Sequence, residues 1–392
     1  MTLQKLLSSL LFTCLLSSCA GSAPGSSPQP SAAPDNQEST EQAKIENIEI
    51  KMNQVFHSTD IQVDYSELEK RGFAFGDSLT LTFSNGTVID DLPFYNGYYA
   101  KMEHPVAVYY PGLYGLNFAL NLGRSTWETY GFQEGDSVTI ELREKGKYKN
   151  EQKTFAQTHS DDLKDYTSPE RFANFRALAG GSLLPDFVYR SATMTSSSMN
   201  RAAVVDDLAE KYGVKAVLDF SDTQEDLQKY RGESTWSSDY FDRLEESGKV
   251  KLVGLGVNPA SEEFHKDLSE ALYWLTRQEG PYLIFCMEGK DRTGYASSLI
   301  EALCGVDYDD LLSDYIKTYE YYYDMTEEAK PDQRRAVIET SFDPIMEIIF
   351  EMKPTEDVKT LDYAEGARRF FRKGGLSDEQ IDEMVQVFTG KK

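Results

Sequence analysis

The chain has 392 residues and a formal net charge of −25. This length suggests two or three folded units, and the apolar content is ample for hydrophobic cores. The acidic charge argues against a general nucleic-acid or anionic-membrane binder, because both partners are themselves polyanions.

The N-terminus is predicted to be a targeting segment, residues 1–18. Lys5 precedes an apolar run that is too short to span a bilayer permanently. The run ends at Leu16-Ser17-Ser18-Cys19-Ala20, which resembles the lipobox of bacterial lipoproteins. The resemblance implies cleavage before Cys19 and lipid attachment to its sulfur, so we expect an extracytoplasmic protein anchored to the membrane by acyl chains. The alternative is a secreted protein that is cut elsewhere.

Residues 19–43 are rich in Ser, Pro, Ala, Gly and Gln and carry almost no large apolar side chain. Such a segment cannot bury enough apolar surface to fold. We therefore expect a disordered tether between the lipid anchor and the folded part of the chain.

Residues 44–155 are predicted to form a small β-rich domain. Two segments in it repeat, Gly72–Leu81 and Gly131–Ile140, and each is a Gly-Asp turn followed by alternating strand-forming residues. The repeats resemble the GD box of small pseudo-twofold β-barrels. Asp77 and Asp136 occupy matching places, and we interpret them as turn caps rather than as a catalytic pair.

Residues 165–392 alternate between buried-strand and helix patterns. Strands are predicted at Val214–Asp219, Val250–Val253 and Tyr282–Phe285, and helices at Ala202–Tyr212, Phe264–Arg277, Tyr295–Cys304 and Ser377–Phe388. This order predicts an α/β fold with a mostly parallel sheet flanked by helices.

The loop after the last predicted strand carries the strongest chemical signal. It reads Cys286-Met287-Glu288-Gly289-Lys290-Asp291-Arg292-Thr293-Gly294. A strand-to-helix loop offers backbone N–H groups and a helix N-terminus, which favour a thiolate and bind phosphate. Cys286 is then the candidate nucleophile that attacks phosphorus, and Arg292 the fork for two phosphate oxygens. The hydroxyl of Thr293 is a candidate hydrogen-bond donor to the sulfur.

The remaining loop residues are assigned to substrate binding: Met287, Glu288, Gly289, Lys290 and Gly294. Gly289 and Gly294 allow close backbone approach and tight packing of the following helix. Lys290 adds a second cation that can contact a second phosphate, and its alternative role is a solvated lysine. The alternative for the whole loop is a buried structural cysteine with a surface arginine.

Cys286 to Gly294 resembles the signature of protein tyrosine phosphatases, in the bacterial subgroup of secreted tyrosine and phosphoinositide phosphatases whose loop ends Gly-Lys-Asp-Arg-Thr-Gly. Further segments resemble the same subgroup: Asn174-Phe175-Arg176 with Gly180-Gly181, Tyr189-Arg190-Ser191-Ala192, Val217-Leu218-Asp219 with Glu225, and Gly305-Val306-Asp307 with Asp314-Tyr315. The chain departs from the family at Phe285, where a histidine is usual, and at Phe220 and Ser221, where an arginine follows the aspartate.

The resemblance implies a tyrosine-phosphatase-like fold and hydrolysis of phosphate monoesters through a phosphocysteine intermediate. The expected substrates are phosphotyrosine proteins and, as a second class, phosphoinositides or inositol phosphates. The resemblance also implies that Asp291 can serve as general acid in this subgroup. The loop Gly254–Pro259 carries asparagine where many relatives have an acid. The alternative for Asp291 is an ion-pair partner of Arg292 or Lys290.

Other site chemistry is not indicated. The four histidines lack ligand spacing and no Cys-x-x-Cys occurs, so we expect no metal and no cofactor. The cysteines do not suggest a disulfide framework, and Cys304 is predicted to be a buried helix residue. Tyr319–Tyr323 is interpreted either as a pocket wall or as tyrosines between core and water. We expect a monomer. The competing function is a noncatalytic, phospholigand-binding surface lipoprotein; a sulfur-transfer or arsenate-reducing enzyme fits the Tyr-Arg-Ser segment less well.

Overall fold

The computed structural model describes residues 43–53, 57–100, 103–109, 115–121, 124–156, 158–353 and 355–391. The predicted signal peptide, the lipidation site Cys19 and all but the last residue of the predicted tether lie outside these residues. Among the helices of the described part, none is long and apolar enough to cross a membrane.

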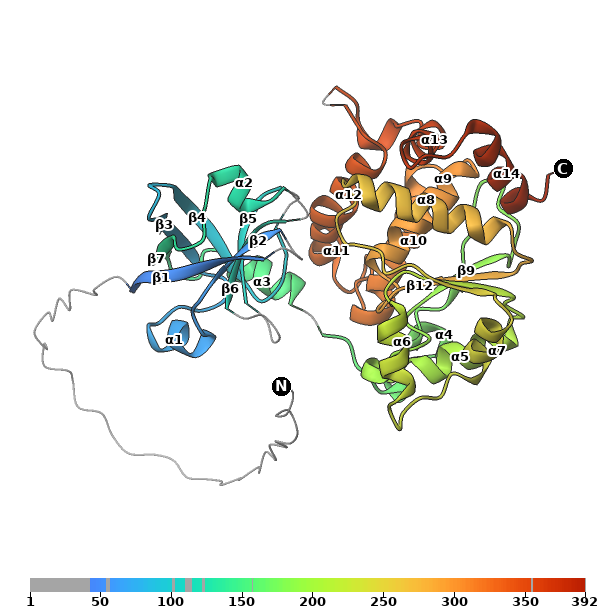
Figure 1. Cartoon of the computed structure of the whole chain (residues 1–392), viewed down its shortest axis with the longest axis horizontal. Helices are drawn as coiled ribbons and strands as arrows, with labels where there is room; N and C mark the ends of the chain where they lie inside the picture. The colour runs from blue at the N-terminus through green and yellow to red at the C-terminus, as the bar shows by residue number, and fades with distance from the viewer. Residues whose placement is uncertain are drawn as a thin grey trace, which may run out of the picture. The chain divides into compact units, whose positions relative to one another are not determined.

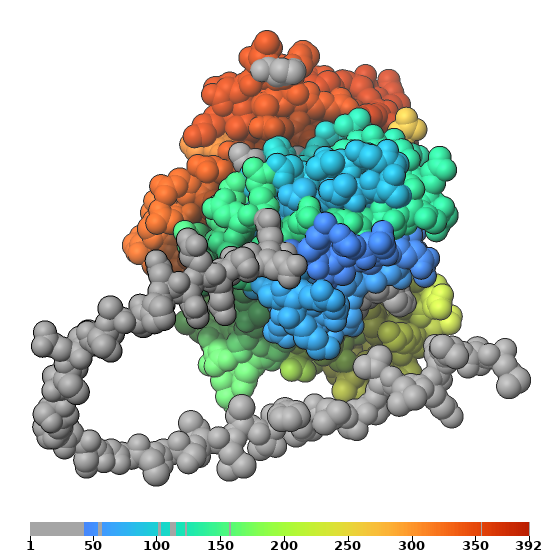
Figure 2. Space-filling model, turned by 90° about the vertical axis from the view of Figure 1, so that its left-hand side faces the viewer, coloured from blue at the N-terminus to red at the C-terminus, as the bar shows by residue number. Residues whose placement is uncertain are grey.

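The first folded part is a closed β-barrel with the strand order β1-β2-β6-β5-β4-β3-β7. Neighbouring strands are antiparallel except for β4 and β5, which pair in parallel. Three short helices accompany the barrel, and in the space-filling view its described residues, blue to green, form one closely packed body (Figure 2). The bounds are β1 (Lys44–Asn53), β2 (Ser58–Ile61), α1 (Tyr65–Lys70), β3 (Ser78–Phe83), β4 (Val88–Tyr95), β5 (Pro105–Val108), β6 (Leu116–Leu120), α2 (Thr126–Tyr130), β7 (Ser137–Glu144) and α3 (Lys149–Phe155).

The two repeated Gly-Asp segments lead into β3 and β7, which are antiparallel neighbours in the barrel. Asp77 accepts a 2.7 Å hydrogen bond from the backbone N–H of Ala74, and Asp136 accepts the equivalent bond from Gln133 at 2.9 Å. Each carboxylate therefore closes its own turn, three residues back. The interpretation of these aspartates as turn caps is confirmed by this geometry.

The second folded part is built on a five-stranded sheet with the order β11-β10-β12-β9-β8. The pairs β10–β11, β10–β12 and β12–β9 are parallel, and β8–β9 is antiparallel. The sequence patterns predicted β10, β11 and β12 but missed the other two strands. The bounds are β8 (Arg176–Ala177), β9 (Val188–Ser191), β10 (Ala216–Asp219), β11 (Val250–Leu252) and β12 (Tyr282–Phe285).

Helices cover both faces of this sheet, with α4 to α7 on one side and α8, α9, α13 and α14 on the other (Figure 1). The bounds are η1 (Leu163–Asp165), α4 (Pro169–Phe172), η2 (Ser197–Met199), α5 (Ala202–Lys211), α6 (Gln224–Arg231), α7 (Asp239–Glu246), α8 (Glu262–Thr276), α9 (Asp291–Leu303), α10 (Tyr308–Tyr323), α11 (Pro331–Val337), the π-helix η3 (Ile338–Phe342), α12 (Asp343–Ile349), η4 (Val358–Thr360), α13 (Tyr363–Lys373) and α14 (Asp378–Thr389).

Strand β12 is buried on both faces, and its side chains alternate between two hydrophobic cores. Tyr282 and Ile284 pack in the core with α8, α9 and α13, whereas Leu283 and Phe285 pack in the core with α5 and α7. The same alternation directs Cys286 into the first core, on the side of α9. The next residues leave the sheet at its carboxyl edge, where ligand sites of α/β folds occur.

Candidate active site

The loop from Cys286 to Lys290 joins β12 to α9. The helix begins at Asp291, four residues earlier than the predicted start at Tyr295. Asp291, Arg292 and Thr293 therefore form the first turn of α9, where unpaired N–H groups and the helix dipole favour an anion. The side chain of Cys286 is only 4% exposed.

Three carbonyl groups of the loop accept hydrogen bonds from residues outside it. Met287 O accepts from the backbone N–H of Thr193 at 3.0 Å, Glu288 O from the Tyr322 hydroxyl at 2.9 Å, and Gly289 O from Arg190 Nη2 at 2.7 Å. Because each peptide unit is planar and trans, the N–H that follows each carbonyl points the opposite way.

The amide groups of the same loop have no partner of their own. Within the described residues, no backbone N–H from Met287 to Lys290 donates a hydrogen bond. A row of unpaired N–H groups directed to one side of a loop is an anion-binding nest. The geometry thus fits the phosphate cradle that the sequence predicts.

Gly289 is required by this arrangement. Its φ is +68°, and a Cβ at this position would lie 2.1 Å from Ser191 O, so a side chain would collide with the backbone at the end of β9. Gly294 is predicted to allow tight packing of the helix. A Cβ there would lie 3.4 Å from Tyr315, an ordinary contact distance, so the packing does not require glycine at this position.

Arg176 of β8 and Arg190 of β9 both contact one buried acid, Asp314, behind the loop. Arg176 Nε donates to Asp314 Oδ1 at 2.7 Å, and Arg190 Nη1 donates to Asp314 Oδ2. Asn174 Nδ2 donates to Glu288 O and Gly289 O at 3.2 and 3.1 Å. Burial opposes the charge of Asp314, but the two arginines hold its pKa well below its usual range. Asn174 and Arg190 therefore stabilise the conformation of the loop by bonding its carbonyl groups.

Arg292 is half-buried and keeps most of its guanidinium available. Nη1 donates to Phe220 O and Leu255 O at 3.3 and 3.2 Å. In the described part of the chain, Nε and Nη2 make no hydrogen bond. The bonded nitrogen fixes the orientation of the group, and the two others can bind two phosphate oxygens.

Asp291 combines access with an elevated pKa. Its side chain is exposed at the pocket, yet the surrounding protein desolvates it and raises the pKa of its carboxyl, with Lys290 acting in the opposite sense. A carboxyl group that can reach substrate and resists ionisation is suited to donate a proton. Neither Lys290 nor Arg292 forms an ion pair with it in the described residues; Lys290 Nζ instead contacts Glu288 Oε2 at 2.7 Å.

Thr293 occupies the first turn of α9 but does not make the predicted hydrogen bond. Its hydroxyl oxygen is buried and has no partner among the described residues. The bond to the sulfur of Cys286 remains a prediction for the reacting enzyme.

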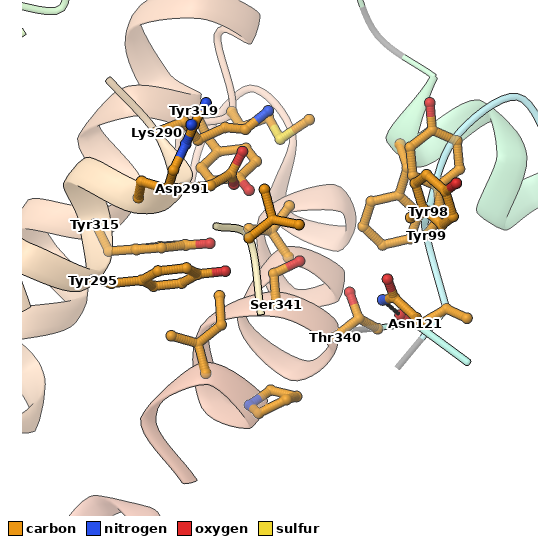
Figure 3. A pocket seen from close by; sticks show the side chains of 18 of the residues that line it. Tyr98, Tyr99, Asn121, Lys290, Asp291, Tyr295, Tyr315, Tyr319, Thr340 and Ser341 are labelled. Carbon is orange, nitrogen blue, oxygen red and sulfur yellow. Dashed lines mark hydrogen bonds between the residues drawn. The ribbon is translucent and has the colours of Figure 1, made fainter. Parts of the chain in front are cut away.

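A pocket opens over this first turn of α9. Figure 3 shows Lys290 and Asp291 on one side of it, with the rings of Tyr295 and Tyr315 side by side and their hydroxyls directed into it. Tyr319 and Tyr323 also line it. Burial raises the pKa of Tyr315 to about 12, so its hydroxyl stays protonated at neutral pH. Two members of the tyrosine run therefore form a pocket wall.

The other tyrosines of the run have structural contacts. Tyr322 donates to the loop at Glu288 O, and Tyr321 lies under the guanidinium groups of Arg171 and Arg176 at 4.6 and 5.7 Å.

One acid near the site and one cysteine at the far end of α9 make structural contacts. Asp219 ends β10 opposite Phe285, and its Oδ1 accepts 2.8 Å bonds from the backbone N–H and hydroxyl of Ser221. Burial and the neighbouring Asp222 raise the pKa of Asp219 well above its usual value. Cys304 is buried on the far end of α9, and burial raises its pKa to about 12. It is an inert core thiol.

The predicted site residues 286–290 lie on the loop between β12 and α9, and residues 291–294 lie in the first turn of α9. No cluster of three or more His, Cys, Asp or Glu side chains suitable for a metal occurs in the described ranges. Sequence patterns missed the bracing roles of Asn174, Arg176 and Arg190, although each lies in a segment that resembles the phosphatase subgroup.

One comparison with known proteins, a family sequence model, supports the same interpretation. Residues 168–390 match the sequence model of a tyrosine phosphatase family. Among solved structures, the chain is similar to the core catalytic domain of the PP-IP phosphatase SIW14 from S. cerevisiae in complex with citrate. The identity is 19% over 45% of this chain and 91% of that chain, with a TM-score of 0.26, and at that TM-score the likeness carries no conclusion about fold or substrate. No curated protein matches the chain.

Proposed function

Because the chain belongs to the tyrosine phosphatase family, we propose that it hydrolyses phosphate monoesters through a phosphocysteine at Cys286. The observation that carries the proposal is the nest of unpaired backbone N–H groups from Met287 to Lys290. The carbonyl groups of Met287, Glu288 and Gly289 are bonded on the opposite side of the loop. Simple phosphate binding needs such a nest but no thiol, and Cys286 is the residue directly before these N–H groups in the chain.

We assign the steps of the proposed reaction to three side chains. The substrate phosphate enters the nest, where Arg292 binds two of its oxygens through Nε and Nη2. The Cys286 thiolate attacks phosphorus, the bond to the leaving oxygen breaks, and Asp291 gives that oxygen its proton. Water then attacks the phosphocysteine with Asp291 as base, which releases phosphate and regenerates the thiolate.

Phosphotyrosine is the first substrate class, and phosphoinositides or inositol phosphates are the second. In the described part of the pocket, the cations are Lys290 and Arg292, and much of the rest of its wall is aromatic or apolar. This lining suits one phosphate on an aromatic group better than a ring bearing many phosphates, because each extra phosphate would need its own cation.

The proposal is tested by phosphate release from phosphotyrosine peptides, phosphoserine peptides, phosphoinositides and inositol hexakisphosphate. We expect the highest kcat/KM for phosphotyrosine peptides and no turnover of any substrate by Cys286→Ser. Phosphate binding by the wild type without turnover of any substrate would instead favour the noncatalytic phospholigand-binding protein.

We also propose that the enzyme acts outside the cytoplasm, held at the membrane by a lipid on Cys19. The support is the segment Leu16–Ala20 alone. Cys19→Ala expressed in a lipoprotein-processing bacterium should lose incorporation of labelled fatty acid and leave the membrane fraction. Continued labelling of the variant would refute the assignment.

A further inference from the structure

A histidine outside the family-matched region lies against the phosphate loop. His159 precedes residue 168, where the match to the phosphatase family begins. Its Nε2 lies 3.7 Å from Glu288 Oε1, and its ring is 4.9 Å from that of Tyr322. The separation from Glu288 is longer than a hydrogen bond, and contacts of this kind in active sites often tighten when substrate binds.

A buried arginine fixes the orientation of this histidine. Arg201 is 0% exposed and donates to three backbone carbonyls, those of Phe172, Met199 and Ser160, each at 2.9 Å. Its Nη2 also lies 3.2 Å from His159 Nδ1 in hydrogen-bond geometry.

The contact with Arg201 fits one tautomer of the neutral imidazole. A guanidinium only donates, so in this tautomer Nδ1 of His159 accepts and the ring proton sits on Nε2. Asp161 Oδ1 lies 3.1 Å from the same Nδ1 and also accepts from Arg201 Nη1. In the tautomer that pairs with Arg201, the Nε2–H of His159 faces Glu288.

Glu288 connects His159 to Lys290, which lines the pocket. Its Oε2 lies 2.7 Å from Lys290 Nζ, and Lys290, then His159, hold the pKa of the Glu288 carboxyl well below its usual range. Its side chain and that of Lys290 are only 31% and 20% exposed. The contacts thus run from Arg201 through His159 and Glu288 to the lysine at the pocket.

We propose that His159 is a positioning residue of the phosphatase site: it holds the Glu288 side chain, and through it Lys290, in the arrangement that receives phosphate. This inference rests on the proposed function. It adds to the site a residue that lies before the matched domain and contacts no reacting atom.

Two substitutions separate hydrogen bonding from packing. His159→Phe keeps a ring against Tyr322 and removes both nitrogens, whereas His159→Gln loses the ring and keeps an amide that can accept from Arg201 and donate to Glu288. For aryl phosphates we expect His159→Phe to lower kcat/KM about fivefold to tenfold, the range for one lost hydrogen bond. His159→Gln should retain at least half of the activity. The reverse order would show that the histidine only packs, and it would overturn the proposal.

The path through Glu288 is tested by a double-mutant cycle. If His159 acts through Glu288, His159→Phe should cost little more activity in a Glu288→Gln background. Fully additive losses would contradict the proposed path. Each variant should unfold at the wild-type urea concentration, within error.

A measurement of inorganic phosphate binding tests the positioning role independently of catalytic activity. In Cys286→Ser, which cannot turn over, calorimetry should show weaker phosphate binding when His159→Phe is added and near-normal binding with His159→Gln. This result would support the positioning role even if no substrate of the wild type were found. Equal phosphate affinity for all three proteins would overturn the role, whatever the activity.

Discussion

Arg190 Nη2 donates a 2.7 Å hydrogen bond to Gly289 O, and this contact joins strand β9 to the phosphate loop. The same guanidinium contacts Asp314 through Nη1, so one arginine holds both the acid on α10 and the loop carbonyl. The loop conformation therefore depends on a side chain that is far from it in sequence and only 1% exposed.

Arg190→Lys should impair both folding stability and activity. A lysine has one nitrogen and cannot bond Asp314 and Gly289 O in the same geometry. Losing a hydrogen bond to the buried carboxylate or to the loop carbonyl lowers the free energy of unfolding by about 1–3 kcal/mol, and a displaced loop should reduce kcat/KM about 100-fold. Urea unfolding and phosphate release measure the two effects. Arg243→Lys, in an exposed pair with Glu210, is the control and should change neither.

Gly289→Ala should abolish phosphate release, because the new Cβ would collide with Ser191 O. Gly248 is a matched control: its φ is +70° and open space surrounds the position of a Cβ. Gly248→Ala should cost about 1–2 kcal/mol of backbone strain and leave kcat/KM unchanged. An active Gly289→Ala enzyme, with more than half of the wild-type rate, would show that the close approach to β9 does not shape the loop.

Asp291→Asn should show a loss that depends on the leaving group. With phenyl phosphate we expect kcat to fall about 100-fold, and with p-nitrophenyl phosphate less than tenfold, because p-nitrophenolate departs without a proton. The acid must be protonated, and its pKa is raised above the usual value. The wild-type rate on phenyl phosphate should therefore decline as pH rises through that pKa, and the variant should lack this decline. Equal losses on both substrates would remove Asp291 from the donor role.

His265 should make the protein less stable in acid. It is 1% exposed on α8, and burial lowers its pKa from 6.5 to about 4. Since the unfolded state binds the proton first, stability from the neutral ring is complete above about pH 6.5 and is lost as pH falls toward 4. The loss is on the order of 3 kcal/mol. Urea unfolding of His265→Leu should lack this share of the pH dependence; parallel curves for both proteins would contradict the assignment.

The sequence predicts the reactive loop better than its surroundings, for a physical reason. Strand Tyr282–Phe285 is an uninterrupted apolar run, and its observed bounds are the predicted ones. Helix α9 begins at Asp291, before its predicted start. The prediction missed this first turn because Lys290-Asp291-Arg292 carries no apolar periodicity. His159 is one of four scattered histidines without ligand spacing, since its partners Arg201 and Glu288 are distant in sequence and are brought near only by the fold.

The family-like segments are recognisable by their residues, but their roles are not. Asn174 and Arg190 act by bonding backbone carbonyls of the loop, and a carbonyl partner leaves no trace in a side-chain pattern. The barrel turns are easier to predict, because each aspartate bonds a residue three positions away, which is a local relationship.

The central claim, covalent catalysis by Cys286, is tested most directly by trapping the intermediate. Wild-type enzyme mixed with ³²P-labelled phosphotyrosine peptide and quenched within milliseconds should carry label, and peptide mapping should place it on Cys286. Cys286→Ser should carry none. Rapid phosphate release by the wild type with no label on this residue would contradict the account.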